Sequence, residues 1–439
     1  MANITQVAQA IEDIFGEKLE ELARESKFIK RKVVVNGKGF VQSLVMAFQT
    51  NKAASYSEMS ACASSLAMPM TAQGIEQRFN ERSAQFLKSV LEYAVSVKLQ
   101  GVEEQSIPLL KRFKAIHIRD SSVITLPQAL TDTWKGVGGT NGETAALKLQ
   151  VSWEQCHGAL DGITLQDGFC QDRTSPYQAM ELSEGELHIA DLGYFSLEKL
   201  AQDHQKGVLW LTRLKFKTSL WDEQGIALDL LSFLNGQTQR QLDIQICVGG
   251  KHQLSCRLLA SRVPQEVADQ RRQRIQETYR KKGRQPSAKL LQLAEWTLVL
   301  TNVPQEKLSV QEALVLLKIR WQIELLFKLW KRQLNLDEWN SRNPWRILTE
   351  IYAKLLAAIL FHWTLLFDFW RHPNHSLVKA FKAFQRYITS ILFAINNQEA
   401  MLKILNSLAH CYAKSCRINK HSHAACTFQT HFDPEISLC

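Results

Sequence analysis

Several features that mark large classes of protein are missing from this chain of 439 residues. Its amino terminus has neither the apolar run nor the small-residue cleavage site of a signal peptide. Its nine cysteines are scattered without the spacing of a disulfide framework. We therefore expect the protein to work in a reducing cytoplasm.

The chain also lacks a recognisable nucleotide-binding fingerprint and an uninterrupted membrane span. The glycine-rich run Gly136 to Gly142 has neither the P-loop lysine nor the strand-to-helix setting of a dinucleotide site. The most apolar stretch, Ile351 to Trp370, is interrupted by Lys354, His362 and Asp368. It predicts a buried helix rather than a membrane span. We expect neither a nucleotide energy source nor a membrane partner.

The carboxyl-terminal tail contains cysteines and histidines whose spacing matches no standard zinc finger. They are Cys411, Cys416, His421, His423, Cys426 and His431. We expect a reduced tail without bound zinc.

The composition is that of a globular protein that meets a polyanion. Hydrophobic residues make up 45% and charged residues 22% of the chain, which is long enough for two or three domains. The formal charge is +10 and the pI is near 9.1. This excess of cations favours a polyanionic partner, and the 11 tryptophans suit base stacking as well as a core.

The first hundred residues show helical periodicity. The expected helical segments are Ile4 to Arg24, Gly39 to Phe48, Tyr56 to Ala67 and Thr71 to Leu99. The last segment begins with polar side chains that suit a helix in a DNA groove, namely Thr71, Gln73, Gln77, Arg78, Asn80 and Arg82. A helix-turn-helix and an ordinary amphipathic helix both fit this pattern.

After Pro108 the pattern changes to short apolar runs with high β-propensity. Strands are expected at Ala115 to Leu126, Ala145 to Trp153, Gly158 to Leu165, Glu186 to Asp191 and Gly207 to Leu214, with a helix near Leu197 to Gln205. This order predicts an α/β fold with a mixed five-stranded sheet and flanking helices.

Two acids stand at positions where strands rarely carry them. Asp120 lies inside the apolar run Ile116 to Leu126, and Asp191 follows the run that begins at Leu187. Acids are depleted from strands and are seldom buried without a partner. A strand-end or turn-capping role would explain either acid alone.

A helix expected from Ser309 to Lys331 carries four charged residues within a sector about 80° wide. They are Arg320, Glu324, Lys328 and Lys331. A capping box of Ser309 and Glu312 marks the start of the helix. Because apolar residues cover the other directions, the helix should be mostly buried, and the charges form either an ion-pair ladder or half of an active site.

Asp120, Asp191 and Glu324 would need cations if they converged. Carboxylates in one cleft repel by about 4 kcal/mol per pair at 4 Å and an effective dielectric near 20. Oxygen ligands favour Mg²⁺ or Mn²⁺, and two such ions suit phosphoryl transfer. The pattern predicts nuclease or strand-transfer chemistry.

The spacing of Arg320, Glu324 and Lys331 resembles the R-x3-E-x6-K part of the motif that marks bacterial DDE transposases of insertion-sequence family four. The complete family motif begins with a tyrosine three positions before the arginine, where this chain has Leu317. In the family that tyrosine is assigned to DNA contact near the transposon end. Its replacement therefore bears on end binding and not on the metal ligands.

Three further segments resemble the family in the same order: His117 to Ser122, Ile189 to Phe195 and Trp296 to Pro304. The resemblance implies an RNase H-like core with a β-rich insertion domain, which acts as a homodimer in a synaptic complex to cut and paste double-stranded DNA. It also implies that Asp120, Asp191 and Glu324 hold Mg²⁺ or Mn²⁺, as a pair of ions.

The same resemblance assigns roles in DNA binding. Arg320 and Lys331, with Lys328 as a weaker candidate, would bind phosphates beside the scissile bond. Trp321 and Trp296 match positions that assist a flipped base during hairpin formation. Burial in the core is the alternative for both tryptophans, and we favour it for Trp296.

The resemblance also predicts how the chain is divided. The expected parts are an N-terminal helical DNA-binding domain (1–107), a catalytic core in two pieces (108–214 and 296–345), a β-rich insertion domain (215–295) and C-terminal helices (346–439). Strands of the insertion are expected at Ile226 to Leu234, Arg240 to Gly249 and His252 to Val263. The apolar C-terminal segments Trp345 to Phe369 and His375 to Leu408 are expected to supply a dimer contact.

A basic segment lies just before the return strand at Trp296. Its cations are Arg271, Arg272, Arg274, Arg280, Lys281, Lys282 and Arg284. A solvated helix is one interpretation, and contact with DNA phosphates without base recognition is the one that we favour.

Two other functions fit the same sequence. A stand-alone nuclease of the same fold would degrade DNA without requiring specific ends. A DNA-binding regulator or an inactivated transposase would bind ends without nicking them, and Leu317 and the basic charge favour that alternative.

Overall fold

The computed structural model describes residues 4–30, 35–99, 107–137, 144–250, 253–339, 341–366 and 375–418. The chain forms two compact units. Unit 1 draws its described residues from 4–99, 121–170 and 322–418, and unit 2 from 107–120 and 171–321. Strand β1 (Ile116–Leu126) contributes residues to both units.

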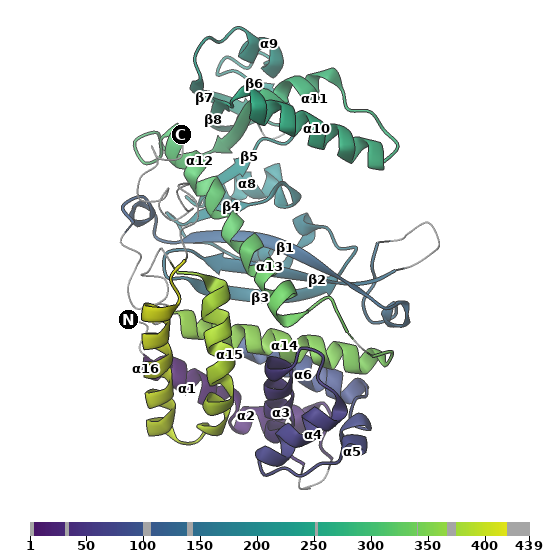
Figure 1. The fold of residues 1–439 in the computed structure, drawn as a ribbon. Coiled ribbons are helices and arrows are strands. Elements are labelled where there is room, and N and C mark those ends of the chain that lie inside the picture. Colours follow the sequence, from purple (N-terminus) through teal and green to yellow (C-terminus); the bar gives the residue numbers. More distant parts are fainter. Residues whose placement is uncertain are drawn as a thin grey trace. The chain divides into compact units, whose positions relative to one another are not determined.

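The amino-terminal part of unit 1 is helical, as its periodicity predicts (Figure 1). Its helices are α1 (Ile4–Ile14), α2 (Glu17–Glu25), α3 (Gly37–Thr50), α4 (Tyr56–Ser65), α5 (Ala72–Glu76) and α6 (Glu81–Ser96). The expected segment Ile4 to Arg24 is divided between α1 and α2. The expectation of one long helix from Thr71 is also wrong. The side chain of Asn80 accepts hydrogen bonds from the backbone N–H groups of Arg82 and Ser83, and it therefore starts a new helix at this point.

The carboxyl-terminal part of unit 1 consists of α14 (Pro344–Leu365), α15 (Leu377–Phe393) and α16 (Gln398–Ser415). Every residue of α14 from Arg346 to Leu365 is buried, and the helix packs against α3 and α6 (Figure 1). Among the described helices, α14 alone is long and apolar enough to cross a bilayer. Its complete burial matches the expected core helix, and the rest of that expected segment, from Phe367, lies outside the described residues.

Polar side chains inside α14 are paired. Lys354 Nζ donates to Glu350 Oε1 at 2.6 Å and to the carbonyl of Asn335 at 3.1 Å. His362 Nε2 donates to the carbonyl of Gly158 at 2.7 Å. These bonds satisfy groups that would otherwise destabilise a buried helix.

The strands of unit 1 are β3 (Ala159–Asp167), β2 (Ala145–Glu154) and the second half of β1. Strands β2 and β3 form an antiparallel pair in which Leu147 lies opposite Asp167. Every residue of β2 is buried, and α6 packs against β3.

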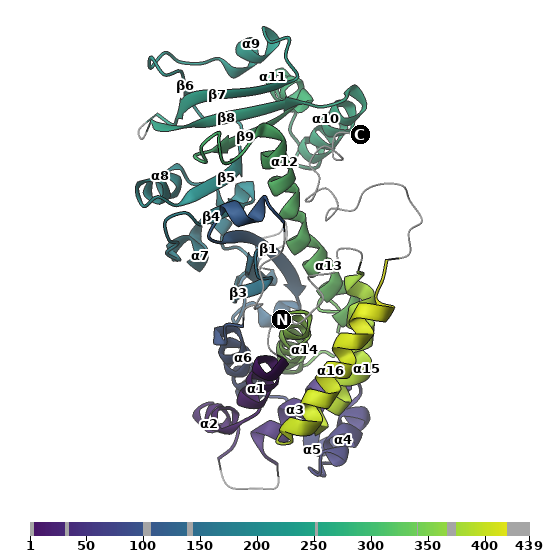
Figure 2. The same cartoon turned by 90° about the vertical axis from the view of Figure 1, so that its left-hand side faces the viewer.

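The strands of unit 2 follow the order β1-β4-β5-β9-β8-β7-β6. They are β4 (Leu187–Ala190), β5 (Leu209–Arg213), β6 (Leu220–Trp221), β7 (Gln241–Val248), β8 (Leu254–Arg262) and β9 (Trp296–Thr301), with the first half of β1. Strands β1, β4 and β5 are parallel, and the other neighbours are antiparallel. The long pair β7 and β8 lies side by side in Figure 2. The expected α/β fold with a mixed sheet is confirmed.

Part of the region expected to be a β-rich insertion differs from the prediction. The segment Ile226 to Leu234 is not a strand, because Leu230–Asn235 forms helix α9. The Asp229 side chain accepts hydrogen bonds from the backbone N–H groups of Leu231 and Ser232 and thereby caps this helix. The other two expected strands are present as β7 and β8.

The remaining helices of unit 2 surround this sheet. They are α7 (Pro176–Ala179), α8 (Leu197–Gln205), α10 (Gln265–Lys281), α11 (Ala288–Gln292) and α12 (Val310–Ile319). Helix α12 packs against β5, β7 and β8. Arg257 of β8 donates to the carbonyls of Val303 and Leu308, which holds the segment that leads into α12 against the sheet.

Candidate active site

Two of the predicted acids come from neighbouring parallel strands. In the register of β1 and β4, Ile118 lies opposite Ile189 and Arg119 lies opposite Ala190. Asp120 and Asp191 are the next residue of each strand path, so they emerge at the same end of the pair. The Asp120 side chain is 13% exposed and the Asp191 side chain 45% exposed.

A guanidinium joins these two carboxylates. Arg320 Nη1 lies 2.6 Å from Asp120 Oδ2, and Arg320 Nη2 lies 3.7 Å from Asp191 Oδ1. The Arg320 side chain is only 15% exposed. Residues that are distant in the sequence thus form one charged cluster within unit 2, which we call the Asp–Arg cluster (Asp120, Asp191 and Arg320).

The charged stripe lies on two helices rather than one. The capping box of Ser309 and Glu312 starts α12 as predicted. Helix α12 ends before Arg320, which has helical dihedral angles, and α13 (Trp321–Leu334) begins at the next residue. The rest of the stripe follows α13, with Glu324 in its first turn.

Within unit 1, α13 is less buried than its apolar sequence suggests. Lys331 Nζ donates to the carbonyl of Val123 within β1 at 2.9 Å, so this cation is bound to the backbone of a strand. Lys328 is exposed and Glu324 is partly exposed. Leu325 is 37% exposed, which contradicts the expectation that the apolar directions of the helix are covered.

The predicted base-contacting tryptophans differ in accessibility. Trp321 is 45% exposed, whereas Trp296 is 5% exposed. Trp296 packs with Leu234 in a small core cluster, and the guanidinium of Arg262 lies 4.8 Å from its ring centre. The structure therefore gives Trp296 the core position that we favoured.

The Asp–Arg cluster has the oxygen donors that a divalent cation of the magnesium type prefers. In the described ranges, no group of three or more His, Cys, Asp or Glu residues is arranged to hold a metal ion. Cys411 and Cys416 of the cysteine- and histidine-containing tail lie within these ranges, whereas the tail from His421 onward lies outside the described residues. The cluster therefore brings two carboxylates, those of Asp120 and Asp191, to one guanidinium.

A buried polar layer lies behind the two acids and was not anticipated from the sequence. His117 and Arg119 alternate with Ile116 and Ile118 along β1, just before Asp120, and both are buried. His188 lies opposite His117 in the register, and burial, with the charge of Arg119 next, holds the pKa of His188 well below its ordinary value. The sequence feature that could have indicated this buried layer is the pair of polar residues His117 and Arg119, which stand two positions apart in an apolar strand.

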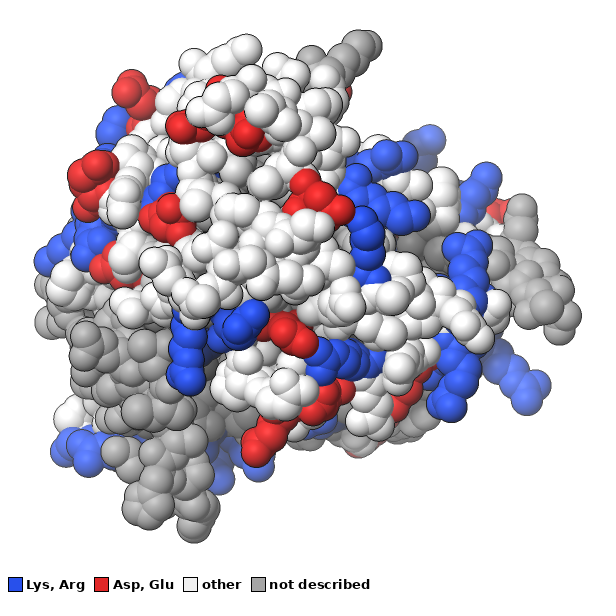
Figure 3. Space-filling model, turned by 90° about the horizontal axis from the view of Figure 1, so that it is seen from above, with Lys and Arg blue, Asp and Glu red and all other residues white. Residues whose placement is uncertain are grey.

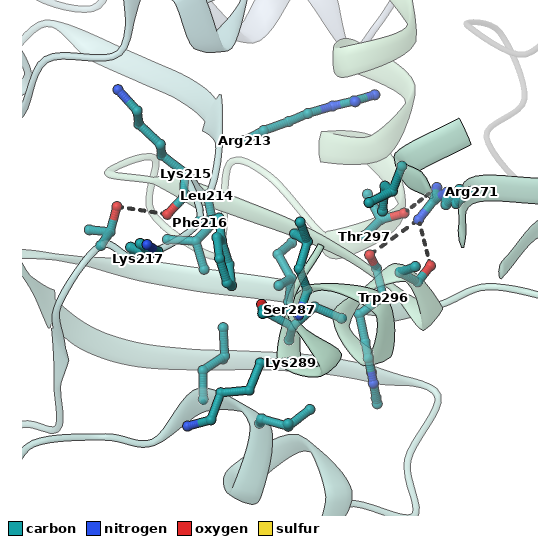
Figure 4. A pocket seen from close by; sticks show the side chains of 18 of the residues that line it. Arg213, Leu214, Lys215, Phe216, Lys217, Arg271, Ser287, Lys289, Trp296 and Thr297 are labelled. Carbon is teal, nitrogen blue, oxygen red and sulfur yellow. Dashed lines mark hydrogen bonds between the residues drawn. The ribbon is translucent and has the colours of Figure 1, made fainter. Parts of the chain in front are cut away.

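A cavity of about 1200 Å³ opens in unit 2 between the sheet and helices α10 and α11 (Figure 4). Leucines and Phe216 form much of its wall. Its cations are Arg213, Lys215, Lys217, Arg271, Arg274 and Lys289. One of them is neutralised within the protein, since Lys289 Nζ lies 3.1 Å from Asp229 Oδ2.

The cations of the basic segment fall into two groups. Arg271 donates to the carbonyl of Trp296 at 3.2 Å and to Thr297 Oγ1 at 2.9 Å (Figure 4). Arg272 lies 2.6 Å from Asp269 and also pairs with Glu295. These two arginines hold α10 against the start of β9.

The other predicted cations of this segment are exposed. They are Arg274, Arg280, Lys281, Lys282 and Arg284. Figure 3 shows lysine and arginine side chains gathered in groups on the face that it draws. A dense group of exposed cations suits a polyanionic partner.

Unit 1 has a basic hollow of its own, of about 370 Å³. It is lined by Lys27, Phe28, Ile29, Lys30, Arg78, Asn80 and Arg82. The guanidinium of Arg78 lies 5.4 Å from the ring centre of Phe28, and partial burial lowers the pKa of Arg78. Arg78 thus lies in the turn before α6 and Arg82 in the first turn of α6, whereas the sequence predicted both on one long helix.

A model of the transposase DDE domain family matches residues 111–360. The chain belongs to this family. The matched range contains the Asp–Arg cluster and Glu324, and membership implies an enzyme that binds DNA and cleaves or transfers its strands. The predicted resemblance to DDE transposases of bacterial insertion sequences is confirmed.

Relatives of this DDE transposase cover nearly the whole chain. The transposase of insertion sequence element IS231F of Bacillus thuringiensis subsp. israelensis is 30% identical over 433 residues, which cover 92% of this chain and 90% of that protein. The IS231E transposase of subsp. finitimus is 28% identical, with 91% and 89% covered. The IS1151 transposase of Clostridium perfringens is 24% identical, with 81% and 79% covered.

Proposed function

We propose that the chain cuts an insertion sequence out of double-stranded DNA and joins it to a target, by metal-dependent phosphoryl transfer. The proposed metal ligands are Asp120, Asp191 and Glu324. The observation that carries the proposal is the convergence of Asp120 and Asp191 on one cation, at the point where the parallel pairing of β1 and β4 ends. Glu324 is included as the third ligand because it matches the family motif and follows Arg320 by one helical turn in the sequence.

The chemistry balances without a nucleotide cofactor. In the first step, a water oxygen bonds to a backbone phosphorus and the bond from phosphorus to the 3′ oxygen breaks, which leaves a 3′ hydroxyl. In the second step, the oxygen of that hydroxyl bonds to a target phosphorus, the bond from this phosphorus to the target's own 3′ oxygen breaks, and the proton passes to that oxygen, so one phosphodiester replaces another. Two Mg²⁺ or Mn²⁺ ions would supply activation of the attacking oxygen and stabilisation of the leaving oxygen.

Residues of the chain would position the DNA strand for these steps. Arg320 and Lys331 would bind phosphates beside the scissile bond, and Lys328 would bind a phosphate farther along α13. Trp321 has the exposure that stacking on an unpaired base requires. The cavity beside Phe216 combines apolar walls with cations, which suits an unpaired nucleotide at a cleaved end.

DNA outside the catalytic site would meet two basic surfaces. One is the exposed group on and after α10, namely Arg274, Lys281, Lys282 and Arg284. The other is the basic hollow of the N-terminal helices. Neither needs to read bases, because contacts to phosphates position a duplex whatever its sequence. We propose that two copies of the chain pair in the cytoplasm to hold both ends of the element.

The test is cleavage of duplex DNA that carries the element's own ends, with Mg²⁺ or Mn²⁺. Asp120→Asn, Asp191→Asn and Glu324→Gln should each lose cleavage by several orders of magnitude while they retain DNA binding. Glu306→Gln is the matched control, because Glu306 is an exposed carboxylate outside the cluster. Normal cleavage by Glu324→Gln would remove this residue from the metal site.

The same assay separates the alternatives. A DNA-binding regulator predicts end binding in a gel shift without nicking under either metal. A stand-alone nuclease predicts cleavage of unrelated duplexes at the same rate and no joined products. Leu317 is the sequence observation that favours the regulator, and it lies 9% exposed within α12.

A further inference from the structure

Arg320 faces a choice of anionic partners. In the DNA-free chain its guanidinium contacts the carboxylates of Asp120 at 2.6 Å and Asp191 at 3.7 Å. These are two of the carboxylates that the proposed function gives to a divalent cation. A metal ion held by them would lie close to the guanidinium, so the two cations would repel each other and compete for the carboxylate lone pairs.

DNA offers the arginine an alternative. A phosphate presents two oxygens to the planar fork of a guanidinium as well as a carboxylate does. Arg320 lies at the junction of α12 and α13, and its backbone already has helical dihedral angles. A transfer from carboxylate to phosphate would take place by rotation of this long side chain, with α12 packed against β5 and β8.

We propose that Arg320 couples metal loading to DNA binding. Without DNA, Arg320 occupies Asp120 and Asp191 and weakens their affinity for a divalent cation. When a phosphate of bound DNA takes the guanidinium, the two carboxylates become available to the metal. The inference rests on the proposed function, since it assumes that these aspartates are metal ligands.

This coupling has a thermodynamic consequence that can be measured. If DNA raises the affinity for the metal, then the metal raises the affinity for DNA by the same factor. The device would also limit hydrolytic damage, because a chain that has not engaged DNA would hold its metal weakly. Arg320 thus acts through the aspartates and is a positioning residue in addition to a phosphate ligand.

The experiment measures Mn²⁺ binding to the full chain by electron paramagnetic resonance, without DNA and with a short duplex of the element's end. Arg320→Ala should bind Mn²⁺ about tenfold more tightly than the wild type without DNA, within the usual range of such couplings. The duplex should raise the affinity of the wild type and have a much smaller effect on Arg320→Ala. Arg320→Lys should lie between the two, because a single ammonium bridges two carboxylates poorly.

Two further variants make the result decisive. Lys318→Ala removes a neighbouring exposed cation and should leave Mn²⁺ affinity unchanged, which controls for net charge. Asp120→Asn should abolish the tight Mn²⁺ site with and without DNA, and circular dichroism verifies that each variant is folded. Unchanged Mn²⁺ binding by Asp120→Asn would overturn the proposed metal site itself. Loss of binding in Asp120→Asn with no gain in Arg320→Ala would overturn the coupling alone.

Discussion

Arginine side chains in this transposase contribute in different ways, and their surroundings distinguish them. Arg271 is half-buried and its hydrogen bonds end on the protein's own carbonyl and hydroxyl groups. Arg274, only three positions away, is exposed on the same helix. Arg320 is mostly buried against two carboxylates. Three arginines of one basic protein thus lie in three different settings: a set of internal hydrogen bonds, open solvent and a pair of carboxylates.

Arg271 and Arg274 should give opposite results when each is changed to alanine. Arg271→Ala leaves several acceptors without a donor and should lower the free energy of unfolding by about 1–3 kcal/mol. Arg274→Ala should change it by less than about 0.5 kcal/mol but should weaken DNA binding. Urea unfolding and a gel shift, run on both variants, check this. Equal losses of stability would contradict the division between the two arginines.

His362 should make the stability of the protein depend on pH. Burial lowers its pKa to about 4, against about 6.5 in the unfolded chain. As the pH falls through this window, the unfolded chain binds a proton that the folded chain does not. The stabilisation is therefore complete above pH 6.5 and declines by up to about 3 kcal/mol toward pH 4.

The check is the melting temperature of wild type and His362→Gln between pH 7 and pH 4.5. Glutamine keeps a donor for the carbonyl of Gly158 but does not titrate. The wild-type melting temperature should fall more steeply than that of the variant. Parallel curves would mean that His362 titrates normally in the folded protein.

At the level of elements, helix caps account for two departures from the predicted structure. Asn80 begins α6 where a longer helix was expected, and Asp229 begins α9 where a strand was expected. In both cases one side chain accepts hydrogen bonds from the first backbone N–H groups, which outweighs the average propensity of the surrounding window. The break before α6 also creates the turn that lines the basic hollow.

The basic hollow should contribute to DNA affinity in proportion to its charge. The double variant Lys27→Asn, Arg82→Gln should weaken duplex binding and reduce the slope of log affinity against log salt by about 2, because each phosphate contact contributes roughly 0.9. Asparagine suits position 27, where φ is 57°. The double variant Lys18→Gln, Lys403→Gln removes the same charge from exposed sites outside the hollow. If this control reduces the slope of log affinity against log salt by the same amount, DNA binding depends on the net charge of the protein and not on the basic hollow.

For the whole molecule, the main feature is how the chain is divided between its units. Residues of β1 before 121 belong to unit 2 and the later ones to unit 1, and the chain passes between the units again between Trp321 and Gln322, at the start of α13. If one unit unfolds, an element shared by both units loses its structure, and the other unit then loses the contacts that this element makes. The proposed metal ligands are divided in the same way, with Asp120 and Asp191 in unit 2 and Glu324 in unit 1.

We therefore expect the two units to unfold together. Far-ultraviolet circular dichroism reports on all the helices, and tryptophan fluorescence reports on buried rings such as Trp153 in unit 1 and Trp210 in unit 2. Their transitions in urea should coincide, as they do for a cooperative two-state process. Two separated transitions would show that the shared elements do not couple the units.

Much of the fold could be recognised along the chain because its causes are local. Strands β1 and β4, the capping box at Ser309 and the positions of Asp120 and Asp191 each depend on a few adjacent residues. The family motif added Glu324 to the candidate site. Periodicity failed where a single cap such as Asn80 changed the course of the backbone.

Other properties depended on contacts between distant parts of the chain. Arg320 is 200 positions from Asp120, and no local pattern shows that its guanidinium meets two aspartates. The inward direction of Arg271 and the burial of Trp296 are set in the same way by packing. Hydrogen bonds between residues a few positions apart are determined by the local sequence. The partner of a charged side chain depends instead on which elements of the tertiary structure pack beside it.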